Sequence, residues 1–390
     1  MKIVDLQVIP FWVMSKPYVN GAFLPEEKMV QTVTKIVTDD GAEGYYFGGH
    51  RHGDLEGLST DERAVLEGRI KSLVLGQDPY DREKFWQLMF PPIVQENLLS
   101  VLDMALWDLQ ARAAGIPVHK LLGGCREKVK AYASSFPSMG GPEVYAKHAS
   151  QCKHRGYKAY KIHPHYYSFD PITKKYDMSL PSPIDQQIAT CRLVRKAVGD
   201  DMVLMYDPWG TYRTYEEALK MGRALEELNF YWYEHPMQEY RVKSYIQLAA
   251  QLDIPILSPE IAEGSLYTRA DWISRNASDM SRIDVLRGGI TGCRKMAAIC
   301  EAFGMRLELH MSGFGNLQIL GATSESLCEY YERGLEAPGL DYDVPQPYLE
   351  EICDPLDAEG YVRVPQGPGM GYKIRWDYIN DNLVHDIPNH

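Results

Sequence analysis

The sequence predicts an α/β protein in which an N-terminal α+β unit is followed by a barrel of parallel strands. From about Val129 onwards, short apolar segments with strand character alternate with helical segments, and there are eight such strands. Eight strands separated by helices are typical of a parallel β/α barrel. The predicted strands, in chain order, are VKAYASS, AYKIHPH, MVLMYDP, FYWYEHP, PILSPE, RIDVLRGG, RLELHM and SLCEYYE.

The chain before the barrel has a different pattern. It opens with MKIVDLQVIPFWVM, whose alternation of apolar and polar residues indicates a strand, and continues with helical patterns at 59–76 and 97–115. Ser59 and Glu62 have the spacing of a capping box at the start of the first helix. We therefore expect a capping α+β domain at 1–125, a barrel at 126–355, and a C-terminal segment at 356–390 that packs back on the cap.

Composition narrows the class of protein. The 390 residues are 45% hydrophobic and 24% charged, with a formal net charge of −12. Such an acidic chain argues against general binding to nucleic acids or anionic membranes. No apolar run approaches the roughly 18 residues of a membrane-spanning helix, and the first residues do not resemble a signal peptide, so we expect a cytoplasmic protein. The seven cysteines include no CxxC pair, which favours reduced thiols over disulfides or a zinc site.

Three acidic residues end successive predicted strands. Asp207, Glu234 and Glu260 are separated by 234 − 207 = 27 and 260 − 234 = 26 residues, and each interval is one β/α unit. A single acid at a strand end is more often a loop residue or a helix N-cap, but three at this spacing converge on one mouth of a barrel. Their mutual repulsion calls for a hard divalent cation, and Mg²⁺ is the simplest choice.

The next two strands end in a second pair of functional residues. Asp284 follows Glu260 by 24 residues, and His310 follows Asp284 by 26. A carboxylate beside an imidazole fixes its tautomer and supports its protonated form, as a general acid or base requires, although a lone His310 would more often be a core residue. On the second strand, Lys161 and His163 project to one face, so Lys161 is a candidate base across the mouth from His310.

Taken together with DMALWDLQARAAGIPVHKLLGG at 103–124, this ordered set of residues resembles the mandelate racemase subgroup of the enolase superfamily. The resemblance spans essentially the whole chain and implies a modified TIM barrel, (β/α)₇β, with a capping domain. It places one Mg²⁺ per subunit on Asp207, Glu234 and Glu260, and an acid that binds the substrate carboxylate on Glu329, with Glu332 as the alternative. It also implies a homo-oligomer.

One departure from the family pattern concerns the second strand. Many members carry Lys-x-Lys where this chain has Lys161 and His163, which leaves the role of His163 open. We expect Lys161 to face one side of the α-carbon of a metal-bound carboxylate and His310 the other, and either can take the α-proton, depending on the configuration of the substrate. As a base, Lys161 would have its pKa lowered by the metal, by His163 and by partial burial. A protonated Glu329 would help to stabilise the enediolate, and His310 would protonate a leaving β-hydroxyl or return a proton to the opposite face.

The residues that determine substrate specificity are expected in two cap loops, at 16–27 and 45–57. Their candidate substrate-binding residues are Lys16, Tyr18, Asn20, His50, Arg51 and His52. Polar side chains suit a polyhydroxylated small-molecule carboxylate, so we expect a Mg²⁺-dependent dehydratase that converts an aldonate or aldarate to a 2-keto-3-deoxy acid. The alternatives are a racemase, epimerase or cycloisomerase acting at the α-carbon of a carboxylate, and a binding or regulatory barrel without catalysis.

Overall fold

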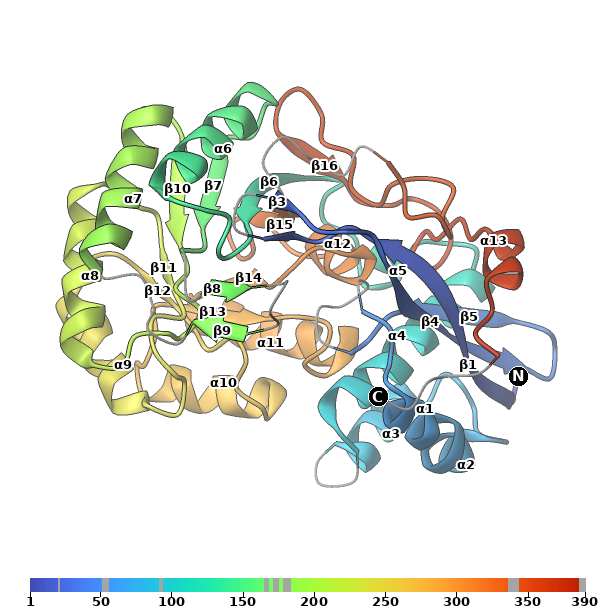
Figure 1. Ribbon diagram of the computed structural model, residues 1–390. Coiled ribbons are helices and arrows are strands. Elements are labelled where there is room, and N and C mark those ends of the chain that lie inside the picture. Colours follow the sequence, from blue (N-terminus) through green and yellow to red (C-terminus); the bar gives the residue numbers. More distant parts are fainter. Residues whose placement is uncertain are drawn as a thin grey trace.

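The computed structural model describes most of the chain. The described residues are 1–19, 22–50, 56–90, 94–164, 168–170, 175–177, 184–335 and 344–385. Figure 1 shows two parts, a barrel whose helices wrap its outer side and an N-terminal cap beside it.

The barrel contains the eight predicted strands in the predicted order. Its sheet runs β14-β13-β12-β11-β10-β7-β6-β15, with parallel pairing between neighbours, and β16 adds antiparallel to β6. The predicted fold class is therefore confirmed. The strands are β6 (Lys128–Ser135), β7 (Ala159–Ile162), β10 (Val203–Tyr206), β11 (Tyr233–Glu234), β12 (Ile256–Leu257), β13 (Met280–Ile283), β14 (Arg306–Leu309), β15 (Tyr330–Leu335) and β16 (Tyr361–Arg363).

Helices connect these strands, as a parallel barrel requires. They are α6 (Pro142–His154), α7 (Ile184–Val198), α8 (Tyr215–Glu227), α9 (Val242–Gln251), α10 (Ser265–Ser274), α11 (Gly289–Phe303) and α12 (Phe314–Gly321). A short hairpin, β8 (Ser168–Asp170) with β9 (Lys175–Asp177), lies in the long connection after β7.

A side chain closes the barrel between β14 and β15, the strands at the two ends of this order. The buried carboxylate of Glu308 in β14 accepts the N–H groups of Glu329 and Tyr330 at 2.9 and 3.1 Å. The backbone N–H of Leu307 also donates to the carbonyl of Leu327 at 2.8 Å. These contacts bring the start of β15 against β14 and complete the ring of strands.

The cap is an antiparallel sheet covered by helices. Its strands β1 (Ile3–Ser15), β4 (Glu27–Thr38) and β5 (Glu43–Phe47) pair in the order β1-β4-β5, and β2 (Tyr18–Val19) pairs with β3 (Ala22–Phe23). Ser59 and Glu62 form the predicted capping box at the start of α1. The cap helices are α1 (Thr60–Val65), the π-helical turn η2 (Leu66–Ile70), α2 (Lys71–Val74), α3 (Arg82–Met89), α4 (Glu96–Ala113) and α5 (Val118–Leu121).

The C-terminal part of the chain returns to the cap. The N–H of Trp12 donates to the carbonyl of Asn382 at 2.9 Å, and the N–H of Val384 donates to that of Pro10 at 3.0 Å. Helix α13 (Trp376–Asp381) accordingly lies beside β1 (Figure 1).

Hydrogen bonds between α4 and the start of α11 join the cap to the barrel. Ser100 Oγ accepts the N–H groups of Gly288 and Gly289 at 2.8 and 3.0 Å, and Asp103 Oδ2 accepts that of Thr291 at 2.9 Å. Because α11 begins directly after β13, at the end where the parallel strands finish, these bonds hold the cap beside the barrel mouth.

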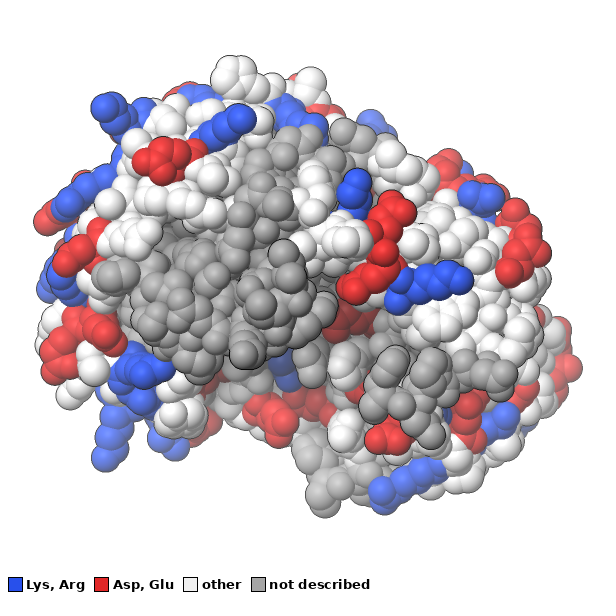
Figure 2. Space-filling view, viewed as in Figure 1, with Lys and Arg blue, Asp and Glu red and all other residues white. Residues whose placement is uncertain are grey.

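Acidic and basic side chains are interspersed over the part of the surface that Figure 2 colours. Among the described residues, no helix is both long enough and apolar enough to cross a membrane.

Candidate active site

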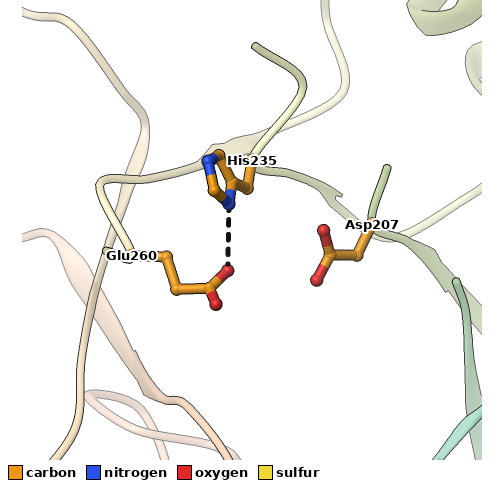
Figure 3. A group of neighbouring side chains, drawn as sticks. All are labelled: Asp207, His235 and Glu260. Carbon is orange, nitrogen blue, oxygen red and sulfur yellow. Dashed lines mark ion pairs between the residues drawn. The ribbon is translucent and has the colours of Figure 1, made fainter. Parts of the chain in front are cut away.

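Two of the three predicted metal ligands converge at the barrel mouth. Asp207 follows β10 and Glu260 follows β12, and both side chains are buried. Their carboxylate oxygens and a ring nitrogen of His235 lie within 4.8 Å of one another. Figure 3 shows the two carboxylates pointing toward one another, with His235 ion-paired to Glu260 through a Nδ1 to Oε2 distance of 3.3 Å.

The third predicted ligand, Glu234, is engaged by two buried cations. Its Oε1 lies 2.5 Å from Arg282 Nε, and its Oε2 lies 3.0 Å from Lys161 Nζ. Arg282 and Lys161 also contact the two oxygens of Glu332, at 2.6 and 2.8 Å. Two carboxylates and two cations therefore alternate in a closed ring inside the barrel, and their formal charges cancel.

Sequence reasoning missed Arg282 in this ring. A signal was available, because Arg282 precedes Asp284 by two residues and side chains two apart on a strand share a face. Since Asp284 was expected to face the mouth, Arg282 should have been placed inside the barrel beneath it.

Lys161 lies deep in the ring rather than at the edge of an open pocket. Its side chain is 0% exposed, and Nζ also lies 3.5 Å from Asp207 Oδ2. Burial alone would lower the pKa of Lys161, but Glu234 and Glu332 outweigh it and hold the pKa well above its usual value. Two carboxylates from other strands thus stabilise the ammonium form, and the expected lowering of the Lys161 pKa, which depends on a bound cation, stays a prediction.

His163 occupies the more accessible position on the same strand end. Its Nδ1 lies 2.5 Å from the carbonyl oxygen of Ser135, and its Nε2 lies 2.9 Å from Asp207 Oδ2. Because a carbonyl oxygen can only accept, Nδ1 carries a proton, and Nε2 is the atom able to exchange one. His163 therefore has a fixed tautomer and a reactive nitrogen beside a candidate metal ligand.

His310 has a similar environment, next to Glu260 rather than Asp207. Its Nδ1 lies 2.8 Å from Asp284 Oδ2, and its Nε2 lies 3.2 Å from Glu260 Oε1. Burial would lower the pKa of His310, but Glu260 and Asp284 outweigh that effect and raise it. The structure thus brings together the expected Asp284 and His310 pair, with the imidazolium favoured.

The expected eighth-strand acid needs correction. Glu329 precedes β15 at the end of the barrel remote from the mouth, where it lies 3.0 Å from Lys130 Nζ and accepts from Tyr231 Oη at 2.6 Å. Glu332, the alternative, lies within the ring of charges and also accepts the N–H of Met311 at 2.7 Å. The last barrel strand was predicted a few residues too early in the chain, so Glu329 was preferred to Glu332 at the mouth.

His235 and Glu239 form a support for Glu260 that sequence reasoning also missed. Both side chains are buried, and the Nε2 of His235 lies 3.7 Å from Glu239 Oε1. Glu239 in turn accepts the backbone N–H of Glu260 and, at 2.5 Å, that of Ala262. The backbone and the carboxylate of Glu260 are therefore both held in place.

A hollow of about 140 Å³ opens over these residues at the mouth of the barrel. The residues that line it are Ser134, Ser135, Phe136, Pro137, His163, Trp209, Glu260, His310, Met311, Glu332 and Gly334.

The cap residues expected to bind substrate are not part of this described lining. Lys16 Nζ lies 5.2 Å from the ring centroid of Phe23, and His50 Nδ1 lies 2.8 Å from Glu62 Oε2, within the cap. Tyr18 belongs to β2, and its side chain is outside the described part of the structure, as are Asn20, Arg51 and His52. The substrate-binding role of these loops stays a prediction.

The donor set fits a divalent cation. Asp207, Glu260 and a third donor from the end of β11 are buried and close together, and oxygen-rich groups of this kind hold Mg²⁺. The third donor is either Glu234, an oxygen ligand now paired with Lys161 and Arg282, or its neighbour His235.

The fold and the site define a β/α barrel with a cluster of buried acidic residues at its mouth and a separate cap. Comparison with known families identifies the family to which this barrel belongs. Residues 7–123 match the N-terminal domain of mandelate racemase / muconate lactonizing enzyme, and residues 144–378 match the enolase C-terminal domain-like family. The chain belongs to this family, and the resemblance predicted from its motifs is confirmed.

Named relatives include both dehydratases and an isomerase. A solved D-glucarate dehydratase from Agrobacterium tumefaciens, complexed with magnesium, is 35% identical with a TM-score of 0.87, over 99% of this chain and 100% of that one. An arabinonate dehydratase of Saccharolobus solfataricus is 29% identical over 90% of both chains. A D-galactarolactone cycloisomerase of Agrobacterium fabrum is 26% identical over 94% of this chain and 95% of its own.

Proposed function

We propose that this protein is a Mg²⁺-dependent dehydratase that converts an acid sugar, an aldonate or an aldarate, into its 2-keto-3-deoxy acid. One observation carries the proposal: His163 and His310 line the same hollow, and each has Nδ1 fixed and Nε2 beside a candidate metal ligand. Dehydration needs a base for the α-proton and an acid for the departing β-hydroxyl. Two orientated imidazoles at one site can supply both.

The metal is assigned to Asp207, Glu234 and Glu260, with one Mg²⁺ per subunit. We prefer Glu234 to His235 as the third ligand because Mg²⁺ favours oxygen donors. His235 then remains against Glu260 and fixes its orientation. When bound, the cation supplies stabilisation of the negative charge that develops on the substrate carboxylate.

The remaining roles follow from burial and contacts. His163 is assigned as the group that removes the α-proton, because its Nε2 is at the hollow, whereas Lys161 is fully buried and kept as an ammonium by Glu234 and Glu332. Lys161 then contributes positive charge toward the substrate carboxylate. His310, with its raised pKa, donates a proton to the leaving hydroxyl.

The names of the relatives favour an acid sugar as substrate. Those relatives include dehydratases of arabinonate, D-gluconate, D-galactonate and D-glucarate. A racemase, epimerase or cycloisomerase is the second candidate, favoured by the same two imidazoles, which could remove and return a proton, and by the cycloisomerase among the relatives. The intact acids and imidazoles count against a non-catalytic barrel.

A panel experiment separates these functions. The enzyme with Mg²⁺ is incubated with D-glucarate, D-gluconate, D-galactonate and arabinonate, and 2-keto acid is measured as its semicarbazone. A keto product from one acid supports dehydration. A change in optical rotation without any keto product would favour the isomerase, and no change with any carboxylate would contradict both catalytic proposals.

A further inference from the structure

The hollow at the barrel mouth has an apolar wall as well as a polar floor. The floor contains His163, His310 and two carboxylates, whereas the wall is formed by Phe136, Pro137, Trp209 and Met311. A sugar acid has polar groups along its whole length, but each hydroxyl-bearing carbon also carries hydrogen, so one side of its chain can be largely apolar. The wall is suited to that side.

Trp209 is the largest member of the wall, and its backbone is strained. It is 44% exposed, although it follows the buried Asp207 by only two residues. Its φ is +51°, a left-handed conformation that is a genuine outlier for a bulky residue. Such strain persists only where the surroundings enforce it, and it is frequent at functional sites.

The enforcing contact comes from a candidate metal ligand. Asp207 Oδ1 accepts the N–H of Trp209 at 2.7 Å, while Oδ2 of the same carboxylate lies 2.9 Å from His163 Nε2. Asp207 therefore holds the backbone of Trp209 beside the reacting end of the hollow, and the indole lies in the hollow's lining.

Met311 repeats this arrangement on another strand. Its φ is +65°, and its N–H donates to Glu332 Oε2 at 2.7 Å. Trp209 follows the third barrel strand, β10, and Met311 follows the seventh, β14, so the two residues leave opposite sides of an eight-stranded ring. Buried acids of the site thus hold an apolar side chain on each side of the mouth.

We propose that Trp209 is a specificity-determining residue whose ring packs against the C–H face of the substrate chain beyond the two reacting carbons. This inference rests on the proposed function, because it presumes a substrate with such a chain. An aromatic face carries partial negative charge and a large apolar area, so it attracts C–H groups while hydroxyl groups on the other side of the chain stay solvated or reach the cap. The Met311 side chain limits the space on the opposite side of the substrate.

The test compares a long and a short 2-hydroxy acid. D-Glucarate has a chain beyond the two reacting carbons that the proposal places against Trp209, whereas glycolate has a carboxylate and a hydroxyl but no further chain. Dissociation constants are measured by calorimetry with Mg²⁺ in a His310→Asn background, in which turnover is expected to be lost. We expect Trp209→Ala to weaken glucarate binding by about tenfold and to change glycolate binding by less than about threefold, with Trp209→Phe close to the parent.

A matched control is available in Phe303, another exposed aromatic residue. It ends α11 at the far end of the barrel and is 67% exposed, so Phe303→Ala should change neither constant. Glucarate binding that survives Trp209→Ala would overturn the role of Trp209 alone, as would an equal loss for both acids. Binding of glycolate but of none of the panel acids by the parent protein would instead remove the proposed substrate class, and the inference with it.

Discussion

His163 and His310 present the same ring atom to the hollow and are held by the same kind of contact. In each residue Nδ1 faces an oxygen acceptor, the Ser135 carbonyl or the Asp284 carboxylate, and Nε2 faces a buried acid. They differ in the partner of Nδ1. Asp284 adds a second carboxylate beside His310, whereas the Nδ1 partner of His163 is a neutral carbonyl, so His310 is the member better suited to donate a proton.

Removal of the metal should abolish activity. We expect EDTA to eliminate turnover and Mg²⁺ to restore it, because buried Asp207 and Glu260 repel one another without a cation. Glu234→Gln should weaken Mg²⁺ binding by about 100-fold, and His235→Asn by only about tenfold, if His235 merely orientates Glu260. Calorimetric titration with Mg²⁺ alone measures both. The reverse order of effects would make His235 the third ligand.

Asp284 should control the alkaline limb of the pH profile. The raised pKa of His310 extends its protonated form to higher pH, and activity that needs this proton is lost as the pH rises through that pKa. Asp284→Asn removes the stabilising charge and lowers the pKa, so the decline in kcat should move to lower pH. Asp271→Asn serves as the control, because Asp271 is an exposed acid of α10 that is paired with Arg275. An unmoved alkaline limb in Asp284→Asn would exclude His310 as the acid.

The junction of cap and barrel should be sensitive to one methyl group. Gly289 begins α11 with φ +68°, and a Cβ there would lie 2.2 Å from Asp103 Oδ2. We expect Gly289→Ala to lower the free energy of unfolding by about 2 kcal/mol more than Gly304→Ala. Gly304 is the C-cap of the same helix, with φ +64° and open space around it, so it has the left-handed backbone without the clash. Urea denaturation compares the variants, and equal losses would show that the junction adjusts to the added methyl group.

The main features of the site could be predicted from the sequence because parallel strands finish at one end of a barrel. Asp207, Glu260, Asp284 and His310 were placed at strand ends by the spacing of the β/α units, and the structure brings all four to the mouth. This inference needs only approximate strand positions. The capping box of Ser59 was likewise predictable, because it depends on four consecutive residues.

The remaining features depend on information that a single strand does not carry. The last strand was predicted at 326–332 but runs from Tyr330 to Leu335, and this shift moved Glu329 to the mouth in place of Glu332. The pKa of Lys161 depends on acids from two other strands, so its direction could not be deduced from its neighbours in sequence. Burial and cross-strand charge therefore had to come from the structure.

The last prediction distinguishes Lys161 from His163 as the base. If His163 removes the α-proton, His163→Ala should lose both turnover and exchange of the α-proton with D₂O while Mg²⁺ still binds. Lys161→Met should mainly weaken substrate binding, because it removes a buried positive charge beside Asp207, although Glu332 and Glu234 would also lose a partner. His310→Asn should lose dehydration and retain slow exchange, since proton removal does not need the acid.

Exchange measured by NMR in D₂O, alongside kcat and KM for each variant, decides between the two residues. Unfolding curves provide the control for Lys161→Met, whose loss of a buried cation lowers stability as well. A His163→Ala enzyme that still exchanges the α-proton, with only its pH profile shifted, would return the role of base to Lys161. In that case a bound cation would have to overcome the two carboxylates that hold Lys161 in its charged form.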